Sequence, residues 1–308
     1  ILFVFILPKI DNLEILNCRC IMKFFFSLLV IILGFSLSCS KENQEPVLTI
    51  GGIPDQEISR LEIRFNTLAE YLSEELNMEV NYIPSVEYAA LVTAFQRGDI
   101  QLAWFGGLTG VQARILTPGS NAIAQRPRDK NFASVFVIGT DVIASDLQDL
   151  KGLRFTFGSE SSTSGHLMPR FFLTEAGVNA ESDFEGPPSY SGSHDKTWKL
   201  VEAGSFQAGV LNEAVWERAN REGSVDTTKI KKLSTTPSYY DYHWVLRKGT
   251  DAQFGTGFTD EVTQALLNLS KENNPQLLEL FQAESFIPTS NSHYQPIETV
   301  ARELGLVE

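Results

Sequence analysis

Apolar and polar positions follow two alternating patterns along most of the chain after residue 46. Short apolar runs predict buried strands, and longer stretches with apolar residues three or four positions apart predict amphipathic helices. The run 47–50, for example, predicts a strand, and a helix follows it. The apolar residues of that helix are Ile58, Leu61, Phe65, Leu68, Leu72 and Leu76. This alternation predicts an α/β protein with parallel sheets covered by helices.

The strand and helix alternation runs through the chain twice. We expect a first lobe over residues 47–136, a second over 137–240, and a return to the first over 241–308. The chain would then cross twice between the lobes, with hinges at 135–140 and 238–244. Ligands of open α/β sheets bind beyond the carboxyl ends of the strands, so the cleft between the lobes is the expected site. The expected strands are 47–50, 79–83, 100–105, 122–125, 133–139, 153–157, 207–211 and 243–247.

The region before residue 46 has the pattern of a leader. The first methionine is Met22, and we expect residues 1–21 to be upstream translation. After Met22 come one basic residue, an apolar run over 24–35 and small residues, which is the pattern of a secretory signal too short to span a bilayer stably. Cys39 would follow the cut, which predicts a lipoprotein with a signal peptide over 22–38 and a tether over 39–46. Ser36 stands where such signals usually have Leu, so another processing site stays open.

Composition limits the classes of partner. All three cysteines, Cys18, Cys20 and Cys39, lie in or at the edge of the leader, which leaves the predicted domain without a thiol or a disulfide. The formal net charge of the chain is −13. Removing residues 1–38 makes the net charge slightly more negative, because more basic than acidic residues are lost. This balance excludes a nucleic-acid-binding surface, and it means that an anion must be held by local donors.

A hydroxyl-rich turn over residues 158–165 carries the clearest candidate chemistry. It follows an apolar run and precedes a helical pattern, so backbone N–H groups without helical partners would point outward at the positive end of the helix dipole. Four consecutive hydroxyl residues add donors, and Gly165 allows close approach of the backbone. These features predict a small-oxyanion site. An ordinary helix N-cap is the alternative, because Ser and Thr favour caps.

Five short motifs follow one another along the chain, at residues 88–90, 99–106, 161–165, 192–195 and 239–242. In this order they resemble the phosphate/phosphite/phosphonate-binding proteins of ATP-driven importers. The resemblance runs from Ile53 to the C-terminus, and it implies the two-lobed periplasmic-binding-protein fold of type II, each lobe a mostly parallel sheet flanked by helices. The longer strings over 161–173 and 235–244 look most like the selenate-binding branch of these proteins.

The resemblance also implies which residues contact the ligand. It implies that the serine-rich turn and a histidine hold the oxyanion from the second lobe. A tyrosine closes from the first lobe, and an aspartate with a flanking tyrosine contacts the ligand at the crossing. The implied ligand-binding residues are Tyr88, Ser161, Ser162, Thr163, Ser164, His194, Tyr240 and Asp241.

Three further side chains are candidates for the same site: Trp104, Arg126 and Tyr242. Arg126 could supply a charge to the cleft, although the basic residues near it favour a solvated loop. One position departs from the family pattern. Members often have an aromatic residue where this chain has Gly110, which implies either a roomier pocket or a neighbouring residue that fills the space.

The sequence does not support an enzyme. Residues 193–196 contain Ser, His and Asp, but adjacent side chains diverge and cannot assemble a catalytic triad. The motifs G-x-S-x-G and G-x-x-x-x-G-K-[ST] are absent. The four histidines have no metal-ligand spacing, so we expect neither a metal nor a cofactor.

Together, these features predict a monomeric substrate-binding lipoprotein in the periplasm or cell envelope, anchored to the membrane through Cys39. It would capture a small tetrahedral oxyanion of the phosphonate, phosphite and phosphate class. It would deliver this ligand to the permease and ATPase subunits of an ABC transporter. Two alternatives stay open: a selenate or other non-phosphorus oxyanion as the ligand, and an extracellular ligand-sensing module.

Overall fold

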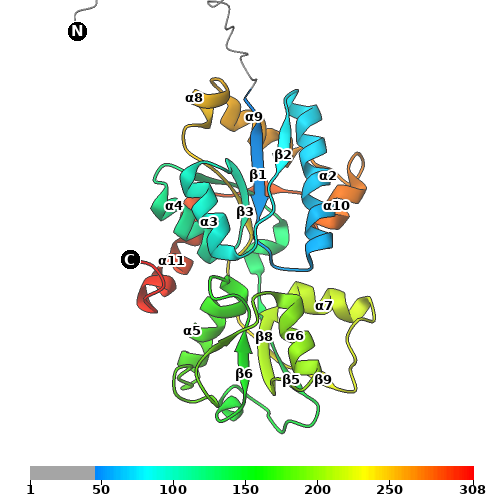
Figure 1. Ribbon diagram of the computed structural model, residues 1–308, viewed down its shortest axis with the longest axis vertical. Helices are drawn as coiled ribbons and strands as arrows, with labels where there is room; N and C mark the ends of the chain where they lie inside the picture. The colour runs from blue at the N-terminus through cyan, green and yellow to red at the C-terminus, as the bar shows by residue number, and fades with distance from the viewer. Residues whose placement is uncertain (1–45) are drawn as a thin grey trace, which may run out of the picture. The chain divides into compact units, whose positions relative to one another are not determined.

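The computed structural model describes residues 46–308, so the expected leader, Cys39 and all but the last residue of the tether lie outside the described residues. The described chain contains two sheets, each covered by its own helices (Figure 1). The first has the strand order β11-β4-β10-β3-β1-β2 and the second has the order β7-β6-β8-β5-β9. No helix within residues 46–308 is both long enough and apolar enough to cross a membrane.

The strands of the first sheet are β1 (Leu48–Gly52), β2 (Val80–Tyr82), β3 (Leu102–Phe105), β4 (Asn121–Gln125), β10 (His243–Leu246) and β11 (Ile287–Pro288). Those of the second are β5 (Ser134–Gly139), β6 (Phe155–Phe157), β7 (Ser189–Tyr190), β8 (Ala208–Asn212) and β9 (Ile230–Thr235).

Both sheets follow one plan. Three strands run parallel in the order second, first, third: β2-β1-β3 in one lobe and β7-β6-β8 in the other. The strand on which the chain arrives from the opposite lobe, β10 or β5, pairs antiparallel with the third of these. The sheets are therefore mixed, where the sequence predicts mostly parallel ones. The chain enters β10 and β5 from the end of the sheet opposite to that at which the parallel strands begin. The apolar pattern of a strand does not show its direction.

Helices cover the sheets as the apolar spacing predicts. In α2, Leu61, Phe65, Leu68 and Leu72 are buried, whereas Ile58 in its first turn is exposed. The first lobe has α2 (Ile58–Leu76), α3 (Tyr88–Arg97), α4 (Gly107–Leu116), η1 (Pro127–Asn131), α8 (Thr250–Phe254), α9 (Phe258–Leu267), α10 (Pro275–Leu280), η4 (Asn291–Tyr294) and α11 (Gln295–Glu303). The second has η2 (Gln148–Leu150), η3 (Thr163–Leu167), α5 (Met168–Glu175), α6 (His194–Glu202) and α7 (Glu213–Arg221).

The two crossings between the lobes lie side by side. Phe132 on the first crossing and Tyr239 on the second exchange both backbone hydrogen bonds, each 2.9 Å long. The expected first hinge at 135–140 and the expected lobe boundary after residue 136 both fall inside β5 or at its end. This strand is paired with β8 and β9 in the second sheet. The first crossing therefore runs between the end of β4 and the start of β5.

Candidate ligand-binding site

The serine-rich turn joins β6 to η3, a short π-helical turn that leads into α5. Ser162 is the N-cap of η3, and its Oγ accepts a hydrogen bond from Gly165 N at 2.9 Å. Gly158 N donates to Gly165 O at 2.7 Å, and a Cβ atom on Gly165 would lie 3.0 Å from the Cα of Gly158. Glycine at position 165 is thus required by the close approach of two backbone segments. The capping role is real for Ser162, and it leaves the hydroxyls of Thr163 and Ser164 available for other partners.

The first turn of α4 meets this serine-rich turn from the other lobe. Leu108 N donates to Thr163 Oγ1 at 2.9 Å, and Gly107 N donates to Asp241 Oδ1 at 2.9 Å. Two backbone amides at one helix N-terminus therefore hold Thr163 and Asp241 close together. Because the N-terminus of a helix is the positive end of its dipole, the start of α4 provides a positive environment at this point without a basic side chain.

Asp241 is the buried acid of this site, with 1% of its surface exposed. Burial raises the pKa of Asp241 to about 7, while the Gly107 N–H and the hydroxyls of Thr163 and Ser164 act to lower it. Its Oδ2 atom has no hydrogen-bond partner among residues 46–308. Near neutral pH, Asp241 can therefore be present as an acceptor-only carboxylate or as an acid that donates one hydrogen bond.

Tyr242 links the two lobes through its hydroxyl group. The hydroxyl donates to Asp55 Oδ2 at 2.8 Å and accepts from Asn212 Nδ2 at 3.1 Å. It also lies 3.4 Å from His194 Nε2. The residues that meet at Tyr242 come from the loop after β1, the end of β8 and the start of α6. Asp55 also bonds directly to the second lobe, because its backbone oxygen accepts from His194 N at 3.1 Å.

His194 is neutral in this setting. Burial lowers the pKa of His194 to about 4, against the raising effect of Asp55 and Asp195. Its Nδ1 accepts a hydrogen bond from Asn212 N at 3.3 Å, so the ring proton lies on Nε2, which faces Tyr242. A Cβ atom on Gly165 would lie 3.2 Å from His194 Cε1, so the ring also adjoins the serine-rich turn.

Tyr88 enters from the first lobe at the start of α3. Its side chain is buried, and burial together with the charge of Asp55 holds the pKa of Tyr88 well above its ordinary value. The phenol therefore stays protonated and can donate. Its Oη and the Oδ1 of Asp55 are buried without a hydrogen-bond partner in the described part of the chain, as is the Oδ2 of Asp241. Buried polar atoms of this kind require a partner, and a ligand can provide one.

Other candidate residues lie further from this cluster. Ser161 is half-buried and lines a separate cavity of about 430 Å³. Of the two tyrosines that flank Asp241, Tyr242 reaches His194, whereas the half-buried Tyr240 stacks on His293 with ring centroids 5.0 Å apart. The serine-rich turn, Tyr88, His194, Asp241 and Tyr242 are therefore brought together. Ser161 and Tyr240 lie at the edge.

Arg126 is buried, so the solvated-loop interpretation is wrong for this residue. Its guanidinium pairs with Asp129 at 2.6 Å and lies 5.2 Å from the ring centre of Trp104 and 5.1 Å from that of Tyr242. Trp104 stacks on Tyr242 with centroids 5.6 Å apart. Arg126 and Trp104 thus pack against the ring of Tyr242. The charge of Arg126 is already matched by Asp129.

Gly110 leaves no additional room in the structure. A Cβ atom there would lie 2.4 Å from two atoms of the His243 ring. The neighbouring histidine therefore fills the space, which was the second of the two alternatives left open by the sequence.

Sequence reasoning missed three contributors: Asp55, Asn212 and the Gly107 amide. Their contacts are with residues far away in the chain, such as the Asp55 to Tyr242 hydrogen bond between positions 187 residues apart. The one local signal was an acidic residue, Asp55, three positions after the end of β1 at Gly52. Within residues 46–308, the structure contains no cluster of three or more His, Cys, Asp or Glu side chains that could hold a metal ion.

Comparison with known proteins places this chain in a family. Residues 50–294 match the family described as "ABC transporter, phosphonate, periplasmic substrate-binding protein". The chain belongs to this family. The two-lobed α/β fold and the resemblance drawn from the motifs are therefore confirmed. Members of the family are periplasmic substrate-binding components of ABC transporters, a class defined by binding and delivery.

Two relatives of this phosphonate-binding family give the comparison detail. The probable ABC transporter phosphite binding protein PhnD1 of Prochlorococcus marinus (strain MIT 9301) is 44% identical over 283 residues, which cover 89% of this chain and 95% of that protein. The structure of PhnD1 in complex with methylphosphonate has a TM-score of 0.82 and covers 85% of this chain and 99% of that chain. The phosphate-import protein PhnD of Mycolicibacterium smegmatis is 25% identical over 217 residues, which cover 67% of this chain and 65% of that protein. The likeness to a selenate-binding branch stays a prediction.

Proposed function

We propose that this substrate-binding protein captures a small phosphorus oxyanion that keeps one acidic proton, such as phosphite or a monoalkyl phosphonate, and delivers it to the permease and ATPase subunits of an ABC importer. The observation that carries this proposal is the pair of amides at the start of α4, which hold a hydroxyl and a buried acid side by side. The names of the relatives, phosphite binding protein and a protein in complex with methylphosphonate, support the same ligand class.

The proposed ligand contacts are the buried polar groups of the cleft. The hydroxyls of Thr163 and Ser164 and the phenol of Tyr88 donate to unprotonated oxygens, and Asp241 accepts from the P–OH group. Hydrogen bonds to an ionised group are roughly twice as strong as neutral ones, so neutral donors can hold an anion in a cleft that excludes water. His194 positions Tyr242, because its Nε2 lies 3.4 Å from the tyrosine hydroxyl.

Closure of the two lobes is the proposed mechanism of capture. The bonds from Leu108 N to Thr163, from Asn212 Nδ2 to Tyr242 and from His194 N to Asp55 O connect the lobes, so they form only when the lobes meet. Ligand binding and the interlobe hydrogen bonds then both shift the equilibrium between the open and closed forms toward the closed form, and the hinge allows the change.

A thermal-shift screen tests the ligand class. Phosphite and methylphosphonate, at a hundred times their dissociation constant, should each stabilise the folded protein by roughly 2.7 kcal/mol. Phosphate and aminoethylphosphonate belong in the same screen, with sulfate and selenate as anions that carry no acidic proton near neutral pH. Stabilisation by sulfate and selenate alone would contradict the proposed class.

We further propose that the mature protein is held at the membrane by a lipid on Cys39, on the basis of the signal pattern in the sequence. Cys39 lies outside the described residues. A Cys39→Ser protein should stay folded and bind ligand, but it should leave the membrane fraction, because the lipid would be its anchor. Fractionation of cells followed by immunoblotting measures this, and a variant that stays with the membrane would show that another segment anchors it.

A further inference from the structure

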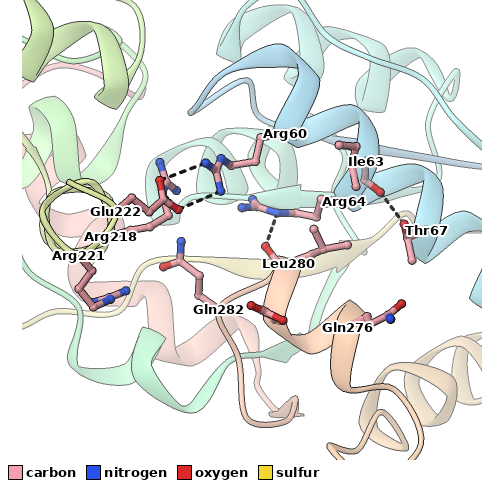
Figure 2. Close-up of a pocket in the computed structure, with 11 residues that line it drawn as sticks. Arg60, Ile63, Arg64, Thr67, Arg218, Arg221, Glu222, Gln276, Leu280 and Gln282 are labelled. Carbon is pink, nitrogen blue, oxygen red and sulfur yellow. Dashed lines mark hydrogen bonds and ion pairs between the residues drawn. The ribbon is translucent and has the colours of Figure 1, made fainter. Parts of the chain in front are cut away.

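A second group of contacts joins the lobes beside the ligand site. We call it the clasp: Gln56, Glu57 and Arg60 of the first lobe, and Asp195, Lys199, Arg218 and Glu222 of the second. It borders a cavity of about 560 Å³ that is also lined by Arg64 and Arg221. Figure 2 shows Arg60, on α2, reaching toward Glu222 at the end of α7.

Arg218 is the centre of the clasp. Its side chain is 8% exposed, and one guanidinium nitrogen donates to Asp195 Oδ1 at 3.1 Å within the second lobe. Another guanidinium nitrogen donates to the side-chain oxygen of Gln56 in the first lobe. Asp195 completes the link, because its Oδ2 accepts from Glu57 N at 3.0 Å. A buried ion pair of one lobe thus binds two consecutive residues of the other.

The outer part of the clasp is exposed to solvent. Arg60 and Glu222 approach to 3.3 Å with 41% of each side chain exposed, and Lys199 and Glu57 approach to 2.6 Å. Exposed ion pairs of this kind contribute little individually. The hydrogen bonds of the buried Arg218 and Asp195 should therefore account for most of the effect of the clasp.

The clasp adjoins the ligand site along the chain on both lobes. Gln56 and Glu57 directly follow Asp55, which bonds Tyr242, and Asp195 directly follows His194. In the described residues, Gln56 Nε2 donates to Asp55 Oδ2 at 3.2 Å, whereas no clasp side chain hydrogen-bonds the serine-rich turn, Tyr88 or Asp241. The clasp can therefore change the balance between open and closed forms without contacting the ligand.

We propose that Arg218, with Asp195 and Gln56, is an affinity-determining positioning group that holds the closed form and slows the release of ligand. This proposal rests on the proposed function, in which capture requires closure. Interactions that exist only in the closed form lower its free energy, so their loss shifts the population toward the open form. Because the lobes open before ligand leaves, the effect should appear mainly in the dissociation rate.

The test removes two first-lobe side chains of the clasp, Gln56 and Arg60, and keeps the buried pair of Arg218 and Asp195 intact. The double variant Gln56→Ala with Arg60→Ala should release methylphosphonate about tenfold faster than wild type in stopped-flow measurements. Its association rate should stay within about twofold, and its circular dichroism spectrum should match that of wild type. Arg302→Gln is the matched control, because it removes an exposed ion pair with Glu298 inside α11. A double variant with the wild-type dissociation rate would overturn the proposal, as would a lowered melting temperature with unchanged rates.

A second measurement does not depend on the ligand. Spin labels at Leu116→Cys in the first lobe and Ile143→Cys in the second, both exposed positions, report the separation of the lobes. The distance distribution of the double variant should shift to longer values than that of wild type, and an unchanged distribution would reject the clasp. If wild type binds neither methylphosphonate nor phosphite, the proposed ligand class is wrong, and the label distances still decide whether the clasp holds the lobes together.

Discussion

Above pH 7, wild-type protein should bind methylphosphonate at least about a hundredfold more tightly than selenate, a difference of roughly 2.8 kcal/mol at 1.4 kcal/mol per tenfold. The physical reason is Asp241, whose buried carboxylate can only accept hydrogen bonds. Methylphosphonate can keep a P–OH group near neutral pH. Selenate is fully ionised, so it would place one anion against another in a poorly solvated cleft. Calorimetric titration of both ligands measures the ratio.

The variant Asp241→Asn should lower the preference for methylphosphonate over selenate, because its side-chain amide can donate a hydrogen bond to an unprotonated oxygen of selenate. Because the pKa of Asp241 is about 7, the affinity for selenate should also depend on pH. As the pH falls through 7, more of the wild type carries the proton on Asp241 and can donate to selenate. Selenate affinity should therefore rise on acidification for wild type and stay nearly constant for Asp241→Asn. Tight selenate binding by wild type above pH 7 would show that Asp241 does not face the anion.

Replacing Thr163 with Ala should weaken ligand binding by about 1.5 to 3 kcal/mol, the range for a hydrogen bond to a charged group. Thr163 has two roles that the change removes together: its hydroxyl is a proposed ligand donor, and its Oγ1 accepts the interlobe hydrogen bond from Leu108 N. Ser164→Ala should weaken binding within the same range through loss of a donor. Isothermal titration with methylphosphonate gives the change directly.

Ser161→Ala is the matched control for both substitutions. It removes the same type of group from the same turn, but Ser161 is half-buried at the edge of a separate cavity. Its affinity should equal that of wild type within about twofold. Should Thr163→Ala and Ser164→Ala also bind like wild type, the ligand site would have to lie away from this turn.

Local patterns predicted the elements of the fold well. The run 47–50 predicted a strand where β1 spans Leu48–Gly52, and the apolar spacing after it predicted α2 with its buried residues. The direction and pairing of the strands were harder to predict from the sequence. The antiparallel position of β10 between β3 and β4 depends on segments more than a hundred residues apart, and no local period encodes it. The first crossing was misplaced for the same reason.

The candidate site shows the same difference between features that depend on neighbours in sequence and features that depend on distant residues. The serine-rich turn was predictable because a strand, a hydroxyl-rich turn and a helix start are adjacent in sequence. Asp55 and Asn212 were not, because their roles come from hydrogen bonds to Tyr242. The burial of Arg126 was also missed, since its neighbours in sequence are polar while its neighbours in space are Trp104 and Tyr242.

The pairing of Phe132 with Tyr239 has a consequence for how the polypeptide matures during synthesis. The second lobe, from β5 to β9, is one continuous segment whose two ends meet at that pair. It can complete its sheet as soon as it has left the ribosome or the export channel. The first lobe cannot, because β10 takes an interior position in its sheet and is made last but one of its strands. Apolar surface of the first lobe therefore stays exposed to solvent until β10 has been made. The part of the first lobe that precedes β5 is synthesised first, so it should depend most on chaperones before synthesis ends.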